Sequence, residues 1–388
     1  MKLGKRETIF LFCYIASIVV ALILREVYNK TRVLWISYAT LSIVVYCSLA
    51  IRSQLTKRDL IIRFGIILLF SIASIISNKP EMMMYAALMC TSELSSFKRI
   101  CKVCFLTCGT VIFFIFIADL LGIVPTRVFY RGSTRAYSFG FGYYNTVPYA
   151  FFFMVLEYFY IKSTKHKETS WIGLMIIFLI NYILYKMSTL RLVFYLVCIV
   201  LILYVLLIKF KLFYLRHKSL VFLSVLVFPL FFFVSLWMNY SYSKTNELFI
   251  KLNQLLSDRL SLGNQALSQY SINLFGNRIE TINTTNEYFY VDSGFLYSFL
   301  GYGLLFSGMA LLIYMFLCKY AASTNNKALF IWLLAVAIFS VVNNTWISLY
   351  INPVLLYFPI LLKKRNANIE QVWEQILFRR KRHFRLTR

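Results

Sequence analysis

Histidine and cysteine are both rare in this chain, with three and eight copies among 388 residues. Five cysteines are scattered singly, and only Cys101, Cys104 and Cys108 form a cluster. A CxxC spacing without a second pair or a nearby histidine is a poor zinc site. We therefore interpret the cysteines as packing residues and expect neither a metal site nor another cofactor.

Polar residues are too few for a soluble domain. Hydrophobic residues make up 60% of the chain and the mean hydropathy is +0.70, whereas soluble domains contain about 45–50% apolar residues. A spanning helix needs about 20 mostly apolar residues. The sequence predicts an all-α integral membrane protein with about twelve spans by that length. Their ranges are 8–24, 33–51, 60–77, 81–94, 105–124, 146–161, 171–188, 190–208, 220–240, 293–317, 328–344 and 345–362.

The distribution of positive charge predicts the orientation. A net charge of +26 would suggest nucleic acid in a soluble protein. With alternating spans, however, roughly 27 lysines and arginines fall inside and about 13 outside, as the positive-inside rule requires. We expect a plasma-membrane protein with both termini cytoplasmic and no nucleic-acid partner. Residues 125–145 and 241–292 then form outer loops, the second of them large.

The predicted domains are a polytopic membrane domain, 1–362, and a basic cytoplasmic tail, 363–388. The tail is predicted to form a basic helix that lies on the anionic inner leaflet of the bilayer. The first apolar run lacks a small-residue cleavage site, so no cleavable signal peptide is expected.

All three histidines, His166, His217 and His383, fall in predicted cytoplasmic segments. An acyltransferase or metalloprotease working on the outer side would need a histidine base or ligand there. Neither class of enzyme has residues to use.

The outer loop 125–145 carries three arginines within nine residues, Arg127, Arg131 and Arg135. Guanidinium groups bind phosphates through paired hydrogen bonds. The loop is a candidate pyrophosphate site, and the alternative is a solvated or headgroup-binding loop. Glycines 140 and 142 would permit close backbone approach near Asn145.

Arg191 lies at the predicted outer boundary, between the spans 171–188 and 190–208. A charge at that depth is costly without a partner, which makes Arg191 a functional candidate. Snorkelling to the surface is the alternative.

The outer segment 241–292 begins with leucines at three- and four-residue spacing after Thr245 or Asn246, either of which can cap a helix. The expected amphipathic helix bears Arg259 on its polar edge. Arg278 and Glu280 follow a glycine turn, and Asp292 stands at the lip of the next span. A desolvated carboxylate there can act as a general base, and it can equally cap the following helix.

Tyrosines accompany these charges in both outer segments. Tyr143, Tyr144, Tyr288 and Tyr290 could stack on sugar rings. They are also typical of an interfacial aromatic belt.

Five stretches together resemble the Wzy-type polysaccharide polymerases of the O-antigen ligase and polymerase superfamily: STRAYSFGFGYYNTVPYA, STLRLVFYL, NQLLSDRLSL, LFGNRIE and YVDSGFLYSFLGYGLLF. The resemblance covers most of the chain in topology, but its motifs are short. It implies a GT-C-like membrane glycosyltransferase that joins repeat units carried on undecaprenyl pyrophosphate at the outer face of the plasma membrane, without a metal. It also implies a flippase and a chain-length regulator of the same pathway as partners.

The resemblance implies roles for particular residues. Arg135, Arg191 and Arg259 match the family's outward-facing arginines and would stabilise the departing pyrophosphate. Asp292 matches its aspartate and would deprotonate the acceptor hydroxyl, with Glu280 or Glu287 behind it. Asn often follows that aspartate, whereas Ser293 follows it here.

Three other functions remain open. An O-antigen ligase shares the topology but carries an outer-loop histidine that this chain lacks. A lipid-linked oligosaccharide flippase should have charges inside several spans, and only Arg63 and Asp119 qualify. A cell-division or elongation type transglycosylase is related by architecture, with no local motif to support it.

Overall fold

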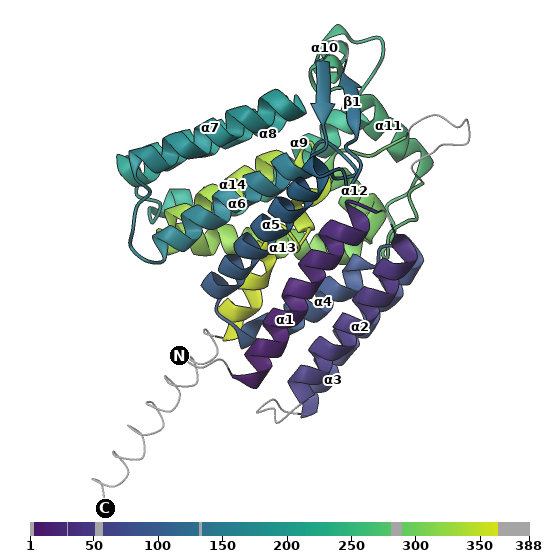
Figure 1. The fold of residues 1–388 in the computed structure, drawn as a ribbon, viewed down its shortest axis with the longest axis vertical. Helices are drawn as coiled ribbons and strands as arrows, with labels where there is room; N and C mark the ends of the chain where they lie inside the picture. Colours follow the sequence, from purple (N-terminus) through teal and green to yellow (C-terminus); the bar gives the residue numbers. More distant parts are fainter. Residues whose placement is uncertain (1–3, 29, 51–56, 132–133, 281–288, 364–388) are drawn as a thin grey trace, which may run out of the picture.

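The computed structural model describes residues 4–28, 30–50, 57–131, 134–280 and 289–363, and the chain there is mainly helical (Figure 1). The α-helices are α1 Lys5–Val20, α2 Thr31–Ala50, α3 Lys57–Ser77, α4 Glu81–Thr91, α5 Phe97–Leu120, α6 Thr146–Ser163, α7 Trp171–Ser188, α8 Arg191–Tyr204, α9 Lys218–Tyr240, α10 Glu247–Leu255, α11 Arg259–Gln269, α12 Gly294–Tyr297, α13 Gly303–Ser323 and α14 Lys327–Ser340. The described residues also include one antiparallel hairpin, formed by β1 Val128–Arg131 and β2 Thr134–Tyr137.

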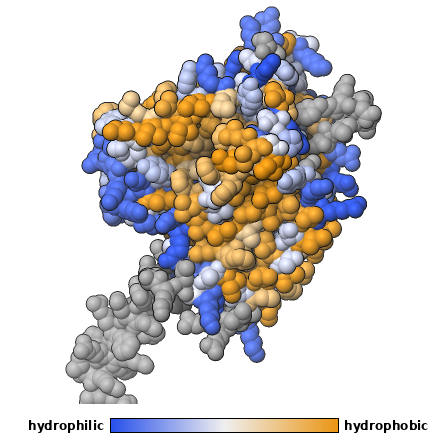
Figure 2. Space-filling model, viewed as in Figure 1, coloured by the Kyte–Doolittle hydropathy of each residue, from blue (hydrophilic) through white to orange (hydrophobic). Residues whose placement is uncertain are grey.

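Eight helices in the described ranges are long and apolar enough to cross a membrane. They are Lys5–Arg25, Thr31–Ser48, Lys57–Ser77, Phe97–Leu120, Trp171–Ser188, Arg191–Lys209, Lys218–Tyr240 and Gly294–Ser323. The described chain is thus mainly helical, with eight helices that could span a membrane. Figure 2 shows a broad hydrophobic surface over the middle of one face, with hydrophilic residues gathered at its edges, as lipid-facing helices require.

The predicted count of twelve spans is not confirmed. The ranges 81–94 and 328–344 hold helices of only 11 and 14 residues, α4 and α14. At the ordinary rise, 14 residues extend about 21 Å, short of the roughly 30 Å hydrocarbon core. Most side chains of both helices are buried. Such helices satisfy the membrane constraint through burial in protein, although an apolar run alone cannot reveal their length.

Two further predicted spans also differ from a long apolar helix. The range 146–161 forms α6, which has 18 residues, most of them buried. The range 345–362 contains two short 3₁₀ turns and the apolar helix Pro353–Lys363. Trp346 and Trp332, among the largest fully buried side chains, fill the core beside these elements.

The predicted span 293–317 is interrupted near its start. A π-helical turn, Ser298–Tyr302, separates α12 from α13, and Gly303 has a φ of +85°. A Cβ at Gly303 would lie 2.3 Å from Gly276 N. The segment 241–292 is hydrogen-bonded to this break, because Asn277 N–H donates to Leu300 O at 2.8 Å and Leu304 N–H to Asn273 O at 2.9 Å. π-turns inside helices are frequent at functional sites.

The segment 241–292 contains the expected capped helix, but in two pieces. Asn246 accepts hydrogen bonds from the N–H groups of Leu248 and Phe249 at the start of α10, as predicted. Ser257 and Asp258 then adopt left-handed φ values of 56° and 63°, which end α10 and begin α11. The single amphipathic helix predicted through Arg259 is therefore wrong, because the turn places Arg259 at a helix start. The predicted basic tail from 364 onward lies outside the described residues.

Candidate functional site

Arg259 and Asp292, both within the segment 241–292, form an ion pair. Arg259 Nε lies 3.1 Å from Asp292 Oδ2, and the side chains are 17% and 27% exposed. Nε itself has no well-aligned hydrogen-bond partner among the described residues. Opposite charges hold the pair together, and a guanidinium has five N–H donors, so Arg259 can bind another anion as well.

Two anchors position the pair. Asn253 Oδ1 accepts from Leu260 N–H and Ser261 N–H, both at 3.0 Å, which fixes the start of α11. Ser293, next to Asp292, shares a 2.8 Å hydrogen bond with Ser235 of α9. Both anchors are buried or partly buried, so the two charges meet in a defined geometry.

The start of α6 borders the pair. Burial lowers the pKa of the Arg259 guanidinium, but Asp292 and the phenols of Tyr149 and Tyr144 more than offset this, so the pKa is raised. The Asn145 side chain interacts with the Tyr149 hydroxyl. Thus four of the predicted site residues, Arg259, Asp292, Tyr144 and Asn145, come together, with Tyr149 as an unpredicted neighbour.

A second group of charges lies at the same end of the bundle and was missed by the sequence analysis. We call Arg25, Glu26, Lys79 and Glu81 the charged cluster. Arg25 Nη1 lies 3.4 Å from Glu81 Oε1, and Tyr302 donates a 2.5 Å hydrogen bond to the same oxygen. Glu81 is 4% exposed on its side chain, so these contacts replace the water it has lost.

Glu26 connects the charged cluster to three other elements. It accepts hydrogen bonds from Thr146 of α6 at 3.1 Å and from Tyr350 at 3.2 Å. Its backbone oxygen accepts from Gly142 N–H at 2.5 Å. A Cβ at Gly142 would lie 2.8 Å from that oxygen, so the expected close backbone approach is present.

Lys79 and Tyr290 connect the charged cluster to the Arg259–Asp292 pair. Lys79 donates to the Tyr297 hydroxyl and also lies over the ring, 4.7 Å from its centroid. Tyr290 stacks on Tyr297 at 6.4 Å between ring centroids and accepts a 3.0 Å hydrogen bond from Asn344. Burial, Tyr297 and Asp292 raise the pKa of Tyr290, while Arg25 opposes this. Tyr290 thus interacts with both groups, and one polar layer extends from Arg259 to Lys79.

The other predicted arginines form no ion pair with this layer, although the Arg127 guanidinium lies close to Gly142. Arg127, Arg135, Arg191 and Arg278 are exposed, and none forms an ion pair in the part of the chain that the structure describes. The Arg131 side chain lies outside the described part. The hairpin packs against α7, whose end precedes Arg191, so Arg135 and Arg191 belong to neighbouring elements.

The remaining predicted residues are mostly at the surface. Tyr143 is 60% exposed and stacks on Phe129, with ring centroids 6.1 Å apart. Glu280 is exposed, and its N–H donates to the Tyr270 hydroxyl at 3.3 Å. Tyr288, like Glu287, lies outside the described residues.

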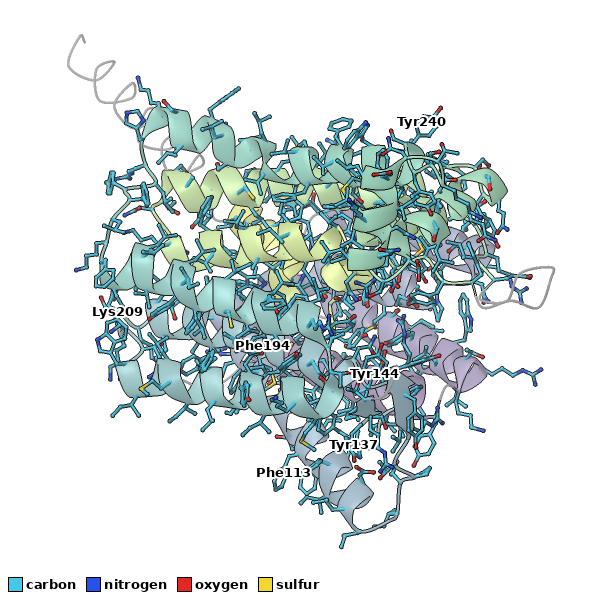
Figure 3. All side chains as sticks on the ribbon, turned by 90° about the horizontal axis from the view of Figure 1, so that it is seen from above. Phe113, Tyr137, Tyr144, Phe194, Lys209 and Tyr240 are labelled. Atoms are coloured by element: carbon cyan, nitrogen blue, oxygen red, sulfur yellow. The ribbon has the colours of Figure 1, made fainter. Side chains whose placement is uncertain are left out.

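The charged cluster could have been recognised in the sequence. Arg25 and Glu26 directly follow the first apolar run, and Lys79 and Glu81 lie between two apolar runs. Charges at the ends of spans are functional candidates. Figure 3 shows Tyr144 and Tyr240 toward one end of the bundle and Lys209 at the other. No group of three or more His, Cys, Asp or Glu side chains able to hold a metal occurs among the described residues.

No family model, curated protein or solved structure matches the chain. The arrangement itself is a layer of alternating cations and carboxylates at one end of an apolar bundle. Such a layer can bind an anionic group through its cations while the displaced carboxylates accept protons.

Proposed function

We propose that this protein is a membrane glycosyltransferase that polymerises oligosaccharide repeat units linked to undecaprenyl pyrophosphate, at the outer face of the plasma membrane. The observation that carries the proposal is the Arg259–Asp292 pair at the mouth of the bundle. It joins an anion-binding guanidinium to a carboxylate that can serve as a base. The resemblance to Wzy-type polymerases supports the same reading.

The reaction breaks the bond between the anomeric carbon of the donor chain and its pyrophosphate oxygen. A hydroxyl oxygen of the acceptor unit forms the new glycosidic bond, its proton passes to a base, and the lipid pyrophosphate leaves with the bonding electrons. Negative charge grows on the leaving oxygen. A preorganised guanidinium in a partly desolvated site stabilises that charge.

Ion pairing in the free protein gives Arg259 and Asp292 linked roles. Pyrophosphate binding to Arg259 would compete with Asp292 for the guanidinium. The carboxylate would then lose its cation and be free to accept the proton of the acceptor hydroxyl. Substrate binding and activation of the base would thereby be coupled in one step.

Exposed arginines have a different place in this proposal. Arg135 and Arg191 belong to the packed hairpin and α7–α8 turn and would meet the pyrophosphate only once substrate is bound. Catalytic contacts are often absent from free enzymes and form in the complex. Tyr144 and Tyr290, beside the pair, would contact the sugars.

A ligase and a flippase are the alternatives. For a flippase, the charge inside a span should be available to substrate, yet Arg63 is engaged by Glu93 at 2.7 Å. A ligase would transfer a finished chain to another acceptor, and the same pair could serve it. The product and the leaflet in which the precursor accumulates distinguish the three.

Complementation of a deletion strain tests the proposal, with cell-surface polymer sized on a gel. The intact chain should restore a ladder, while Arg259→Ala and Asp292→Asn should leave single repeat units on the outer leaflet. Lys251→Ala is the matched control, because Lys251 is exposed on α10 of the same segment. Precursor trapped in the inner leaflet would indicate a flippase. Full-length polymer from both site variants at normal protein levels would refute the proposed site.

A further inference from the structure

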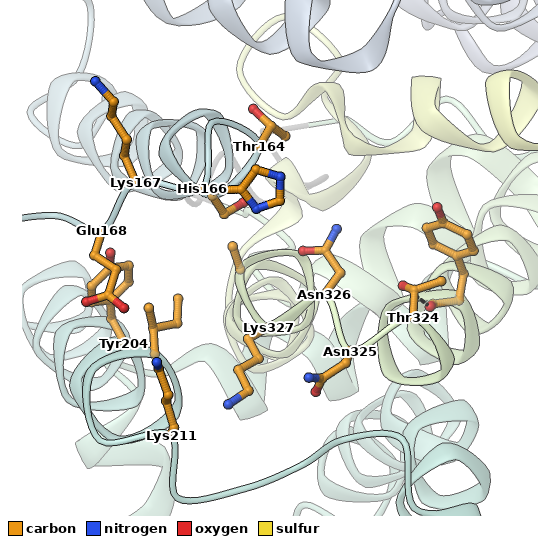
Figure 4. A pocket seen from close by; sticks show the side chains of 14 residues that line it. Thr164, His166, Lys167, Glu168, Tyr204, Lys211, Thr324, Asn325, Asn326 and Lys327 are labelled. Atoms are coloured by element: carbon orange, nitrogen blue, oxygen red, sulfur yellow. Dashed lines mark hydrogen bonds between the residues drawn. The ribbon is translucent and has the colours of Figure 1, made fainter.

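An open cavity of about 580 Å³ (Figure 4) lies at the Lys209 end of the bundle, away from the end where Figure 3 shows Tyr144. Its walls come from the connection after α6, the end of α8 with the turn that follows, and the α13–α14 connection. Each of these connections turns through one residue with left-handed φ, namely His166, Lys211 and Asn325. The cavity is therefore shaped by three helix ends that meet.

Positive charge predominates in the lining. The lining contains Lys167, Lys211 and Lys327 and one carboxylate, that of Glu168. Glu168 is already engaged, because Lys209 Nζ lies 3.2 Å from its Oε2. The positive charge of the lining is thus left without a matching anion in the described part of the chain.

Lys327 lies within this positively charged lining. Burial, followed by the charge of Lys211, lowers the pKa of the Lys327 ammonium group. Its Nζ donates a 2.7 Å hydrogen bond to Leu207 O, a neutral acceptor. Lys327 is also the first residue of α14, and the positive end of that helix adds to the field. An anion in the cavity would offset the repulsion between Lys211 and Lys327 and would interact favourably with the positive end of α14.

Neighbouring side chains place the cavity at a membrane surface. Phe210, Leu212 and Phe213, on either side of Lys211, are exposed. Lys209 lies 5.7 Å from the centre of the Trp171 ring, and Trp171 is also exposed. Exposed aromatic residues interleaved with lysines are typical of the headgroup region.

We propose that this cavity binds the phosphate group of an anionic ligand, through Lys211 and Lys327. The phosphate can belong to an anionic phospholipid headgroup or to a soluble phosphate compound, since the same ammonium groups serve both. Basic pockets between helices at a membrane surface bind anionic headgroups in this way. The site is separate from the proposed glycosyltransferase centre and does not depend on it.

The test measures the rise in melting temperature of the full chain in detergent after each addition. Phosphatidylglycerol is compared with phosphatidylcholine, and inorganic phosphate with chloride at equal ionic strength. Titration of phosphatidylglycerol gives the apparent affinity. Lys211→Gln should weaken it about fivefold and the Lys211→Gln/Lys327→Gln double variant on the order of 25-fold, at about 1 kcal/mol per cation.

Lys165→Gln is the matched control, because Lys165 is exposed in the same connection as Lys167 without lining the cavity. Each variant is read against its own ligand-free melting temperature, since Lys327→Gln also alters a hydrogen bond. A response to phosphatidylglycerol alone identifies a headgroup site, and a response to inorganic phosphate identifies a soluble ligand. No response to either beyond its control, or an equal response in the lysine double variant, would overturn the proposal.

Discussion

Arg259 Nε lies 3.1 Å from Asp292 Oδ2, so one ion pair joins the start of α11 to the residue that leads into α12. The two ends of the segment 259–292 therefore meet. The same two residues border Tyr144 and Tyr149. The sequence singled out Arg259 and Asp292 separately, and the structure pairs them.

Exchanging the two residues of the Arg259–Asp292 pair distinguishes a structural role from a catalytic one. We expect Arg259→Ala and Asp292→Asn each to lower polymer formation by about 10²- to 10³-fold, the usual cost of losing one preorganised charge-stabilising group. The Arg259→Asp/Asp292→Arg exchange should restore the melting temperature and leave polymer formation low. A purely structural pair would recover activity as well in the exchanged protein.

Glu81 should be a stability determinant. Glu81→Gln removes the charge that Arg25 and Tyr302 share, and we expect about 3 kcal/mol of destabilisation, the lower end for breaking a buried pair because Arg25 is partly exposed. Thermal unfolding in detergent measures this. Glu26→Gln should cost less, since Glu26 is more exposed. Equal melting temperatures for wild type and Glu81→Gln would contradict the assigned contacts.

Two glycines make a matched steric test. A Cβ at Gly294 would lie 1.9 Å from Asn343 O, whereas a Cβ at Gly308 meets nothing within 4 Å. Gly294→Ala should destabilise the protein by about 1–3 kcal/mol through overpacking. Gly308→Ala, inside α13, should be neutral or stabilising by up to about 1 kcal/mol. Similar unfolding curves for the two variants would show that the α12 contact is misplaced.

Cysteine labelling tests the orientation predicted from charge. In a Cys47→Ser background, which removes an exposed native thiol, Ser261→Cys should react with an impermeant reagent on intact cells. Lys165→Cys, at the opposite end of the bundle, should react only after lysis. The reverse pattern would place the Arg259–Asp292 pair in the cytoplasm and exclude chemistry at the outer face.

Long apolar runs were predictable because length and hydropathy alone define a helix that can cross a bilayer. The Asn246 cap was also predictable, since its backbone partners are two and three residues away. The short helix α14 was not, because an apolar sequence is equally suited to lipid and to a protein core. Ending α10 required a left-handed Asp258, a conformation that neighbouring residues did not signal.

The charged cluster shows a different limit. Arg25 and Glu81 are 56 positions apart, and Tyr302 is 221 positions from Glu81. Each charge was visible at the end of an apolar run, but only the packing of α1, α4 and the broken α12–α13 helix makes them partners. Arg135 and Arg191 carried equally strong sequence signals and are exposed. Residue type and spacing therefore predicted which chemical groups are present better than they predicted which residues contact one another.

Reconstitution in vesicles tests directly whether the protein polymerises lipid-linked repeat units through the Arg259–Asp292 pair. Purified protein is supplied with undecaprenyl-pyrophosphate-linked repeat units, and released undecaprenyl pyrophosphate is measured together with chain length. We expect one lipid pyrophosphate to be released for each unit added. Both lipid pyrophosphate release and chain lengthening should be lost in Arg259→Ala and kept in Lys251→Ala. Folded protein that releases no lipid pyrophosphate, or that releases it without lengthening the chain, would contradict the account.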